Sequence, residues 1–152
     1  MLPLLIVVGI AVLLLLVLVI GGRMLVNIGG AQVGILERRF IGRPLPEGRV
    51  IANRGEVGIQ ARVLPPGLHV LIPFLFKVQK VPMINVGEDE VGLVESIDGH
   101  ALDPGRIFAR RVPNHDTFQD GEAFLRNGGQ KGTQIDVLPP GQFRINTYLF
   151  RV

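Results

Sequence analysis

The chain opens with an uninterrupted apolar run. Positions 2–20 hold no charged residue and no strongly polar one, and most of them are leucine, valine or isoleucine. A helix rises about 1.5 Å per residue, so residues 2–22 span roughly 30 Å, the thickness of a bilayer's hydrocarbon core. Only a helix satisfies its own backbone groups within lipid. The run therefore predicts a transmembrane anchor over residues 1–26, with lipid-facing side chains that include Leu4, Leu5, Val12, Leu15, Leu18 and Ile20.

A cleaved signal peptide is the alternative interpretation of this run. Such a peptide has a basic start, a shorter apolar core and a cleavage site of the small-x-small type. No lysine or arginine precedes the run, and no Ala-x-Ala pattern follows it. These features favour an anchor that remains in the mature protein.

Beyond the anchor, apolar positions alternate with other residues over short stretches, as in strands with one buried face. Val33 and Ile35 follow this period, and so do Val91 and Leu93. These two stretches resemble each other because the domain contains an internal duplication, in which four blocks of sequence recur in the same order. The matching blocks are 32–37 with 90–95, 44–52 with 101–109, 63–67 with 137–141, and 75–78 with 149–152. We therefore predict a first β-unit over residues 31–82 and a second over residues 88–152.

Each unit contains a Pro-Gly pair between two apolar stretches. In a type II turn, proline fixes φ at the first central position and glycine accepts a positive φ at the second. The pairs are Pro66-Gly67 and Pro140-Gly141. We predict that each pair closes a β-hairpin, which joins residues 59–64 to 68–71 in the first unit and residues 134–138 to 142–145 in the second.

The second unit also carries an insertion over residues 110–129. Asp120 can cap a short helix there, and Gly128-Gly129 would end it. Phe118, Phe124 and Leu125 would pack this helix, expected near residues 118–127, onto a sheet. The predicted fold class is α+β and mostly β, with one N-terminal transmembrane helix followed by duplicated β-hairpin units and a short helix in the second unit.

The composition agrees with a turn-rich β-domain and excludes several kinds of binding site. The chain has 152 residues with 20 glycines and 11 prolines, and it has no cysteine. The lack of cysteine excludes disulfides and thiolate metal sites. With no tryptophan and a single tyrosine, few aromatic rings are available to stack on bases, so we expect no nucleic-acid partner.

Positive charge gathers directly after the anchor. Arginine supplies it between residues 23 and 62, and no lysine occurs there. The positive-inside rule then places the C-terminal domain in the cytoplasm. The arginines that are candidates for contact with an anionic leaflet, at on the order of 1 kcal/mol each, are Arg23, Arg38, Arg39 and Arg43. A solvated face of the β-domain is the alternative role for these arginines.

The sequence shows no convincing catalytic constellation, so we expect neither an enzyme nor a cofactor. Ser96 lacks the nucleophile-elbow pattern, and residues 128–133 lack the Gly-Lys-Ser/Thr order of a phosphate loop. His69 is expected to be a hydrogen-bonded structural histidine. Four residues have side chains that could ligate a metal ion: His100, Asp103, His115 and Asp116. Their spacing matches no standard metal site, so we expect them to be exposed turn residues.

The order of these motifs resembles the start of the SPFH, or band-7, domain of stomatins, prohibitins and flotillins. Residues 34–38 are similar to the family's "V-x-E-R-x-G" strand, and residues 66–74 are similar to its "P-G-L-H-x-x-x-P" segment. Residues 124–132 and 138–141 resemble a bacterial flotillin-like branch. The resemblance covers nearly the whole chain beyond the anchor.

This resemblance implies a membrane-anchored scaffold that organises membrane microdomains or membrane protein complexes through homo-oligomerisation. Family members continue with long coiled-coil helices, which this chain does not contain. Either the chain is the N-terminal portion of a longer protein that self-associates, or it lacks this assembly element. The expected partners are the lipid bilayer, further copies of the chain and other membrane proteins. The alternative is a membrane-tethered, β-rich module that binds another protein without self-assembly.

Overall fold

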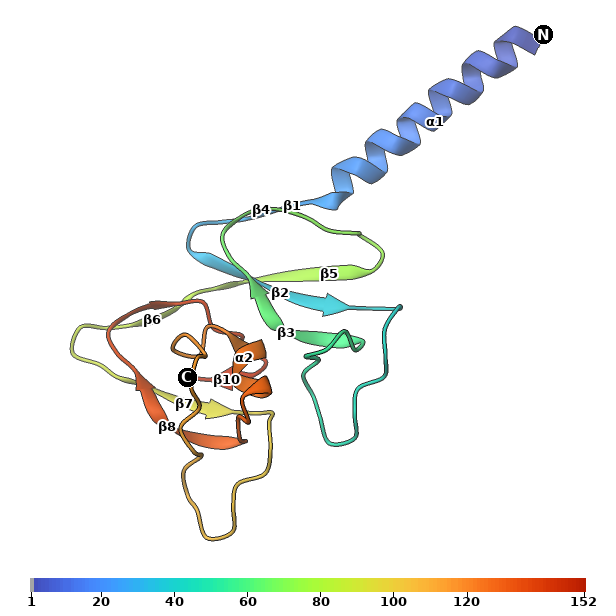
Figure 1. Cartoon of the computed structure of the whole chain (residues 1–152). Helices are drawn as coiled ribbons and strands as arrows, with labels where there is room; N and C mark the ends of the chain where they lie inside the picture. The colour runs from blue at the N-terminus through green and yellow to red at the C-terminus, as the bar shows by residue number, and fades with distance from the viewer. Residues whose placement is uncertain (1) are drawn as a thin grey trace.

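The computed structural model describes residues 2–152, and the side chains of Leu2, Leu4 and Leu5 lie outside the described part. Helix α1 (Leu2–Met24) stands clear of the rest of the molecule (Figure 1). Over Ile6–Met24 the mean hydropathy is 2.8 and no part is buried in the protein. The described chain thus has one N-terminal helix that is long and apolar enough to span a membrane.

Strands make up most of the remaining chain. The first unit contains β1 (Leu25–Ile28), β2 (Gln32–Arg38), β3 (Gly58–Leu64), β4 (Gly67–Val70) and β5 (Phe76–Pro82). The second unit contains β6 (Ile84–Val86), β7 (Gly92–Ser96), α2 (Gly121–Arg126), β8 (Gly132–Leu138), β9 (Gly141–Phe143) and β10 (Phe150–Arg151). The predicted fold class, α+β and mostly β with a short helix in the second unit, is confirmed.

The two units have the same topology. In each, the first strand pairs with the fourth, and the second strand lies between the third and the fifth. The register is also the same, because Gly34 lies opposite Leu64 and its counterpart Gly92 lies opposite Leu138. A register shift follows one residue later in both ladders. The duplication in the sequence is therefore a duplication of the fold.

The hairpins predicted around the Pro-Gly pairs are wrong. β3 pairs with β2, and β4 pairs with β1, so the chain leaves one sheet and enters another at residues 65–66. β8 and β9 part in the same way at residues 139–140. Two consecutive prolines offer no N–H donors, so they cannot continue a ladder between the flanking strands. Gly67 and Gly141 do have the positive φ that was expected, +128° and +143°, but each begins a strand.

Both units begin earlier than the alternation predicts. β1 follows α1 directly, and the backbone N–H of Leu71 donates to the carbonyl of Met24 at 2.8 Å. β1 and β6 occupy residues 25–28 and 84–86, ahead of the expected starts at 31 and 88. These short strands are counterparts of each other, and each pairs with the strand that follows a Pro-Gly pair.

One hydrophobic core joins the two units. Ile51 and Ala61 of the first unit pack with buried residues of the second, among them Phe124, Leu149 and Phe150. α2 lies at this junction, and its N-terminus is capped as predicted, because the Asp120 carboxylate accepts a hydrogen bond from the N–H of Ala123 at 2.9 Å. The units thus pack against each other around shared side chains, without a shared sheet.

The face that carries Val33 and Ile35 is buried in the first unit as predicted, but β2 also buries its opposite face through Gly34 and Leu36. The second unit does have one buried strand face, but it is the opposite one from the face predicted. Val33 and Ile35 are 0% and 2% exposed, whereas their counterparts Val91 and Leu93 are 62% and 66% exposed. β7 instead buries Val94 on its opposite face. The alternation is the same in both units, but the second unit packs on this face of the first unit, whereas no described residue packs on the equivalent face of the second.

Candidate functional site: a helix-proximal apolar surface and an open sheet face

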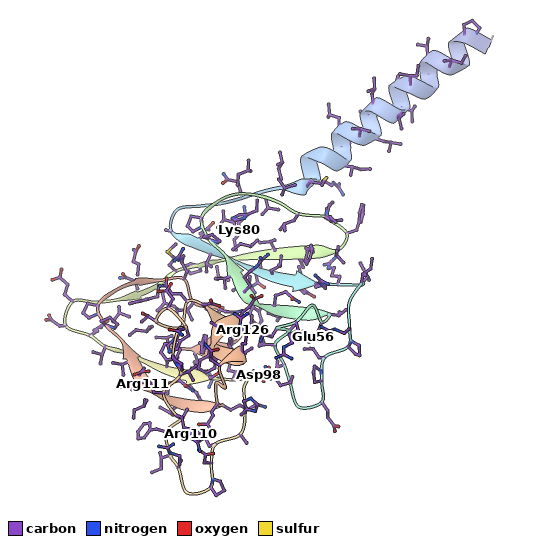
Figure 2. All side chains as sticks on the ribbon, viewed as in Figure 1. Glu56, Lys80, Asp98, Arg110, Arg111 and Arg126 are labelled. Carbon is purple, nitrogen blue, oxygen red and sulfur yellow. The ribbon has the colours of Figure 1, made fainter. Side chains whose placement is uncertain are left out.

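The predicted anchor residues with described side chains all point away from the protein. Val12, Leu15, Leu18 and Ile20 are 50%, 62%, 73% and 44% exposed. Figure 2 shows side chains on every side of α1 with no other segment against them. A helix that is apolar all round and uncovered by protein has the surface that lipid requires.

Exposed apolar side chains continue from α1 onto the adjoining ribbon of β1 and β4 and the loop before β5. β1 and β4 lie directly at the base of α1 (Figure 1). We call the exposed set the helix-proximal apolar surface; it consists of Leu25, Leu68, Val70, Ile72 and Phe74, each 51–66% exposed. The sequence prediction missed this surface because it assigned residues 68–71 to a hairpin within the β-unit.

The structure separates the four arginines that the sequence grouped as leaflet contacts. Arg23 lies in the last turn of α1, beside the helix-proximal apolar surface. Arg38 stands over the ring of Phe76, with 5.2 Å between its guanidinium carbon and the ring centroid, and donates to the carbonyl of Gly55 at 3.3 Å. Arg39 is exposed at the end of β2, and Arg43 lies in the β2–β3 loop, which extends away from α1 (Figure 1).

A second exposed apolar surface lies on the second unit. The sheet of the neighbouring strands β7 and β8 presents Leu93, Ile135 and Val137, and Val91 lies directly before β7. In chain order, Val91, Leu93, Ile135 and Val137 are 62%, 66%, 53% and 42% exposed. We call these four residues the open face. No described residue of the chain covers them, although side chains of this kind are buried in most sheets.

The counterpart of the open face is closed in the first unit. Ile35 and Ala61, which correspond to Leu93 and Ile135, are 2% and 0% exposed. The second unit covers them, with the Asn146 amide donating to the carbonyl of Gln60 at 2.8 Å. Tyr148 reaches the same sheet through a 2.8 Å hydrogen bond to the side chain of Gln79.

The buried carboxylate of Asp98 in the second unit binds the first unit through hydrogen bonds and an ion pair. Asp98 is completely buried, and one of its oxygens accepts from the N–H groups of Val50 and Ile51 at 2.8 and 2.7 Å. Its other oxygen lies 2.9 Å from Nε of Arg49. Burial alone would raise the pKa of Asp98, but these N–H groups, that of Gly99 and the Arg49 charge hold the pKa below its ordinary value.

Two of the three histidines, His69 and His115, have structural contacts within the protein. Nε2 of His69 lies 2.8 Å from the carbonyl oxygen of Pro65, which confirms the predicted hydrogen bond. The expectation of an exposed turn is wrong for His115, which is 7% exposed, stacks 4.4 Å from the Phe118 ring and accepts from the Phe118 N–H at 2.8 Å. Burial lowers the pKa of His115 despite the neighbouring Asp136. Residues 2–152 contain no group of three or more histidine and acidic side chains placed to hold a metal ion.

Comparison with protein-family models, with curated proteins and with solved structures found no match for this chain. The similarity that remains is the one between its own two units. It extends to single hydrogen bonds, because Gln60 and Gln134 each donate from Nε2 to the carbonyls four and two residues earlier, at 2.9 and 2.8 Å. The function must therefore be inferred from the surfaces of the molecule itself.

Proposed function

We propose that this protein is a membrane-anchored scaffold of the SPFH type. It organises membrane microdomains or membrane protein complexes through homo-oligomerisation, and its β-domain lies on the cytoplasmic side. The observation that carries the proposal is the open face of the second unit. The equivalent face of the first unit is buried against the second unit, which has the same fold.

The helix-proximal apolar surface supports a close approach of the domain to the bilayer. Full burial of a leucine, valine or phenylalanine side chain is worth roughly 1.5–3 kcal/mol, so partial insertion of this surface favours the membrane-bound orientation. Arg23 lies where it would meet lipid headgroups. Arg38 donates to a carbonyl of its own protein, and Arg43 lies in a loop remote from α1, so we assign neither to the leaflet.

The open face supports self-association. In proteins built from stacked repeats, a terminal repeat stays soluble when its outer face is polar. The outer face of the second unit is instead apolar, and contiguous exposed apolar patches mark interaction sites. We infer that another copy of this chain covers the open face, since a unit of this fold is what covers the equivalent face in the first unit.

Replacing Leu93 by glutamate is expected to shift the protein from large particles to monomers or dimers in mild detergent. The glutamate places a charge in a contact that must be desolvated, at a cost of several kcal/mol when unpaired. Light scattering coupled to size-exclusion chromatography measures the particle mass. Ile107→Glu is the matched control, because Ile107 is 78% exposed on a loop of the same unit and should not change the mass. A wild-type protein that is monomeric at all concentrations would favour the tethered binding module instead.

Single cysteines placed on the helix-proximal apolar surface are expected to report contact with lipid. The chain has no cysteine, so a probe on Phe74→Cys or Val70→Cys labels one position. An environment-sensitive fluorophore at either position should be quenched by spin-labelled lipids in reconstituted vesicles. The same fluorophore on Ile107→Cys should stay in water and remain unquenched. Equal quenching at all three positions, or quenching at Ile107→Cys alone, would contradict this orientation of the domain.

A further inference from the structure

A pocket of about 410 Å³ lies between the β2–β3 loop of the first unit and the α2 region of the second. Its volume falls within the range of small-molecule sites. Most of its charged lining is basic; the arginines are Arg43, Arg49, Arg54 and Arg126, and His100 adds a further nitrogen-bearing ring. Neither the scaffold function nor the packing of the two units requires four arginines around one cavity.

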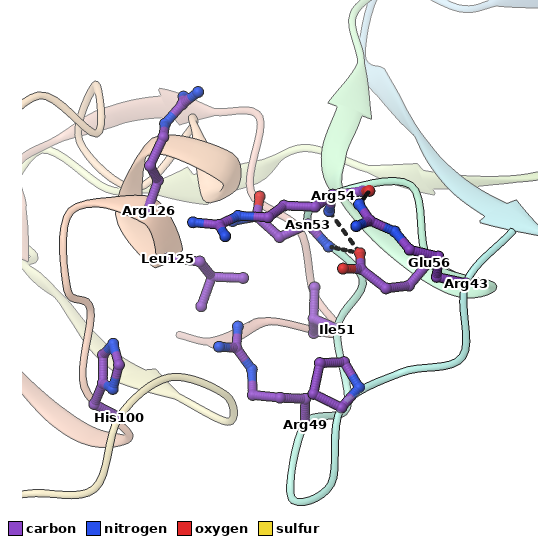
Figure 3. Close-up of a pocket in the computed structure, with 10 residues that line it drawn as sticks. Arg43, Arg49, Ile51, Asn53, Arg54, Glu56, His100, Leu125 and Arg126 are labelled. Carbon is purple, nitrogen blue, oxygen red and sulfur yellow. Dashed lines mark hydrogen bonds between the residues drawn. The ribbon is translucent and has the colours of Figure 1, made fainter.

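Glu56 is the one acidic residue in the lining, and it is turned to the protein's own backbone. Its carboxylate accepts hydrogen bonds from the N–H groups of Asn53, at 3.0 Å, and Arg54 (Figure 3). Burial acts to raise the pKa of Glu56, but these bonds and the charge of Arg43 outweigh it and lower the pKa. Arg43 in turn donates to the carbonyl of Arg54, so this part of the wall is held in place.

Arg49 and Arg54 leave donors directed at the cavity. Arg49 and Arg54 extend from the loop toward Leu125, and Arg126 rises from α2 at the rim (Figure 3). Arg49 has an acidic partner in Asp98. Within residues 2–152, neither Arg54 nor Arg126 forms an ion pair or a side-chain hydrogen bond. Two positive charges at the mouth are thus uncompensated.

We propose that this pocket binds the phosphate group of a soluble small molecule. A guanidinium group presents donors in a planar fork that matches phosphate oxygens, and arginine pairs with phosphate through charge-assisted hydrogen bonds. Arg54 is the main ligand, Arg49 contributes its remaining donors, and Arg126 adds charge at the rim. Ile51 and Leu125 form an apolar wall against which the organic part of the molecule packs.

The position of the pocket indicates a ligand from solution rather than a lipid headgroup. The β2–β3 loop that forms one wall extends from the side of the domain opposite α1 (Figure 1). A headgroup in the same bilayer as α1 would have to cross the first unit to reach it. The site is therefore separate from the surfaces assigned to membrane contact and self-association.

Binding can be tested on the full chain in detergent or nanodiscs by titration calorimetry with inorganic phosphate, in chloride buffers of constant ionic strength. We expect saturable one-site binding that Arg54→Gln weakens about tenfold and Arg126→Gln about threefold, because each removes a charged donor. Arg54→Lys should fall between wild type and Arg54→Gln, since it keeps the charge and loses the fork. Arg62→Gln is the matched control, because it removes an exposed arginine outside this pocket and should leave the affinity unchanged.

Three results would overturn the proposal. The first is phosphate binding that does not saturate. The second is an equal loss of affinity in Arg62→Gln and Arg54→Gln, which would indicate only the general positive field of the protein. The third is binding to vesicles that contain phosphorylated phosphatidylinositol together with no binding of inorganic phosphate, which would identify a lipid ligand.

Discussion

Replacing Asp98 by alanine is expected to lower the free energy of unfolding by about 3–5 kcal/mol. This is the range observed when one partner of a buried ion pair is removed. The substitution leaves the buried N–H of Ile51 without an acceptor and leaves the Arg49 guanidinium without its counter-charge. Urea denaturation of the full chain in detergent, followed by circular dichroism, measures the loss.

Two further variants separate the charge of Asp98 from its volume and from a general effect of lost charge. Asp98→Asn keeps the shape but retains a single carbonyl acceptor, so it should lose at least half as much stability as Asp98→Ala. Glu95→Gln removes a carboxylate from the exposed pair with Arg151 and should cost no more than about 1 kcal/mol. Equal stabilities of Asp98→Ala and Glu95→Gln would contradict a clamping role for Asp98.

The same carboxylate makes stability depend on pH. The pKa of Asp98 is lower in the folded protein than in the unfolded chain, so its contribution is present at neutral pH and is lost as the pH falls below about 4. Asp98→Ala should therefore flatten this acid part of the stability profile. His115 acts at higher pH, because its lowered pKa favours the neutral ring in the fold, and stability falls as the pH drops below about 6.5.

Local patterns in the sequence predicted the elements well. The apolar run predicted α1, the recurring blocks predicted two units of one fold, and Asp120 predicted the start of α2. Each of these signals is contained in a few neighbouring residues. The pairing of strands is not, because a strand that follows a Pro-Gly pair can join the preceding strand or a more distant one, and here β4 pairs with β1.

Sequence patterns do not decide which of two equivalent surfaces is buried in the folded protein. Ile35 and Leu93 occupy the same place in the same motif, yet one is covered and the other is open. Asp98 follows β7 as an ordinary turn residue and becomes a buried acceptor for a loop 47 residues away along the chain. In both cases the difference arises from the packing of one unit on the other. The sequence pattern therefore predicts the repeat but indicates neither the hydrogen bonds of buried Asp98 between the units nor the open face.

The insertion that holds this junction depends on an aromatic cluster. Phe124 is fully buried, and its ring centroid lies 4.9 Å from that of Phe150 and 6.0 Å from that of Phe118. Phe118 is reached by a left-handed segment, with a φ of +51° at Thr117 and +63° at Phe118. L-residues rarely adopt this conformation, so the cluster stabilises a backbone that the local sequence would not choose.

Replacing Phe124 by alanine is accordingly expected to destabilise the protein by about 3–5 kcal/mol, because truncation of a buried phenylalanine leaves a cavity that the surroundings fill only partly. Phe40→Ala, at a side chain that is 74% exposed, should change stability by no more than about 0.5 kcal/mol in the same urea titration. Since α2 packs on β3, amide hydrogen exchange of β3 should also quicken in Phe124→Ala, whereas that of β1 should not. Loss of stability without faster exchange in β3 would mean that α2 supports only the second unit, and that Asp98 and Asn146 hold the two units together without it.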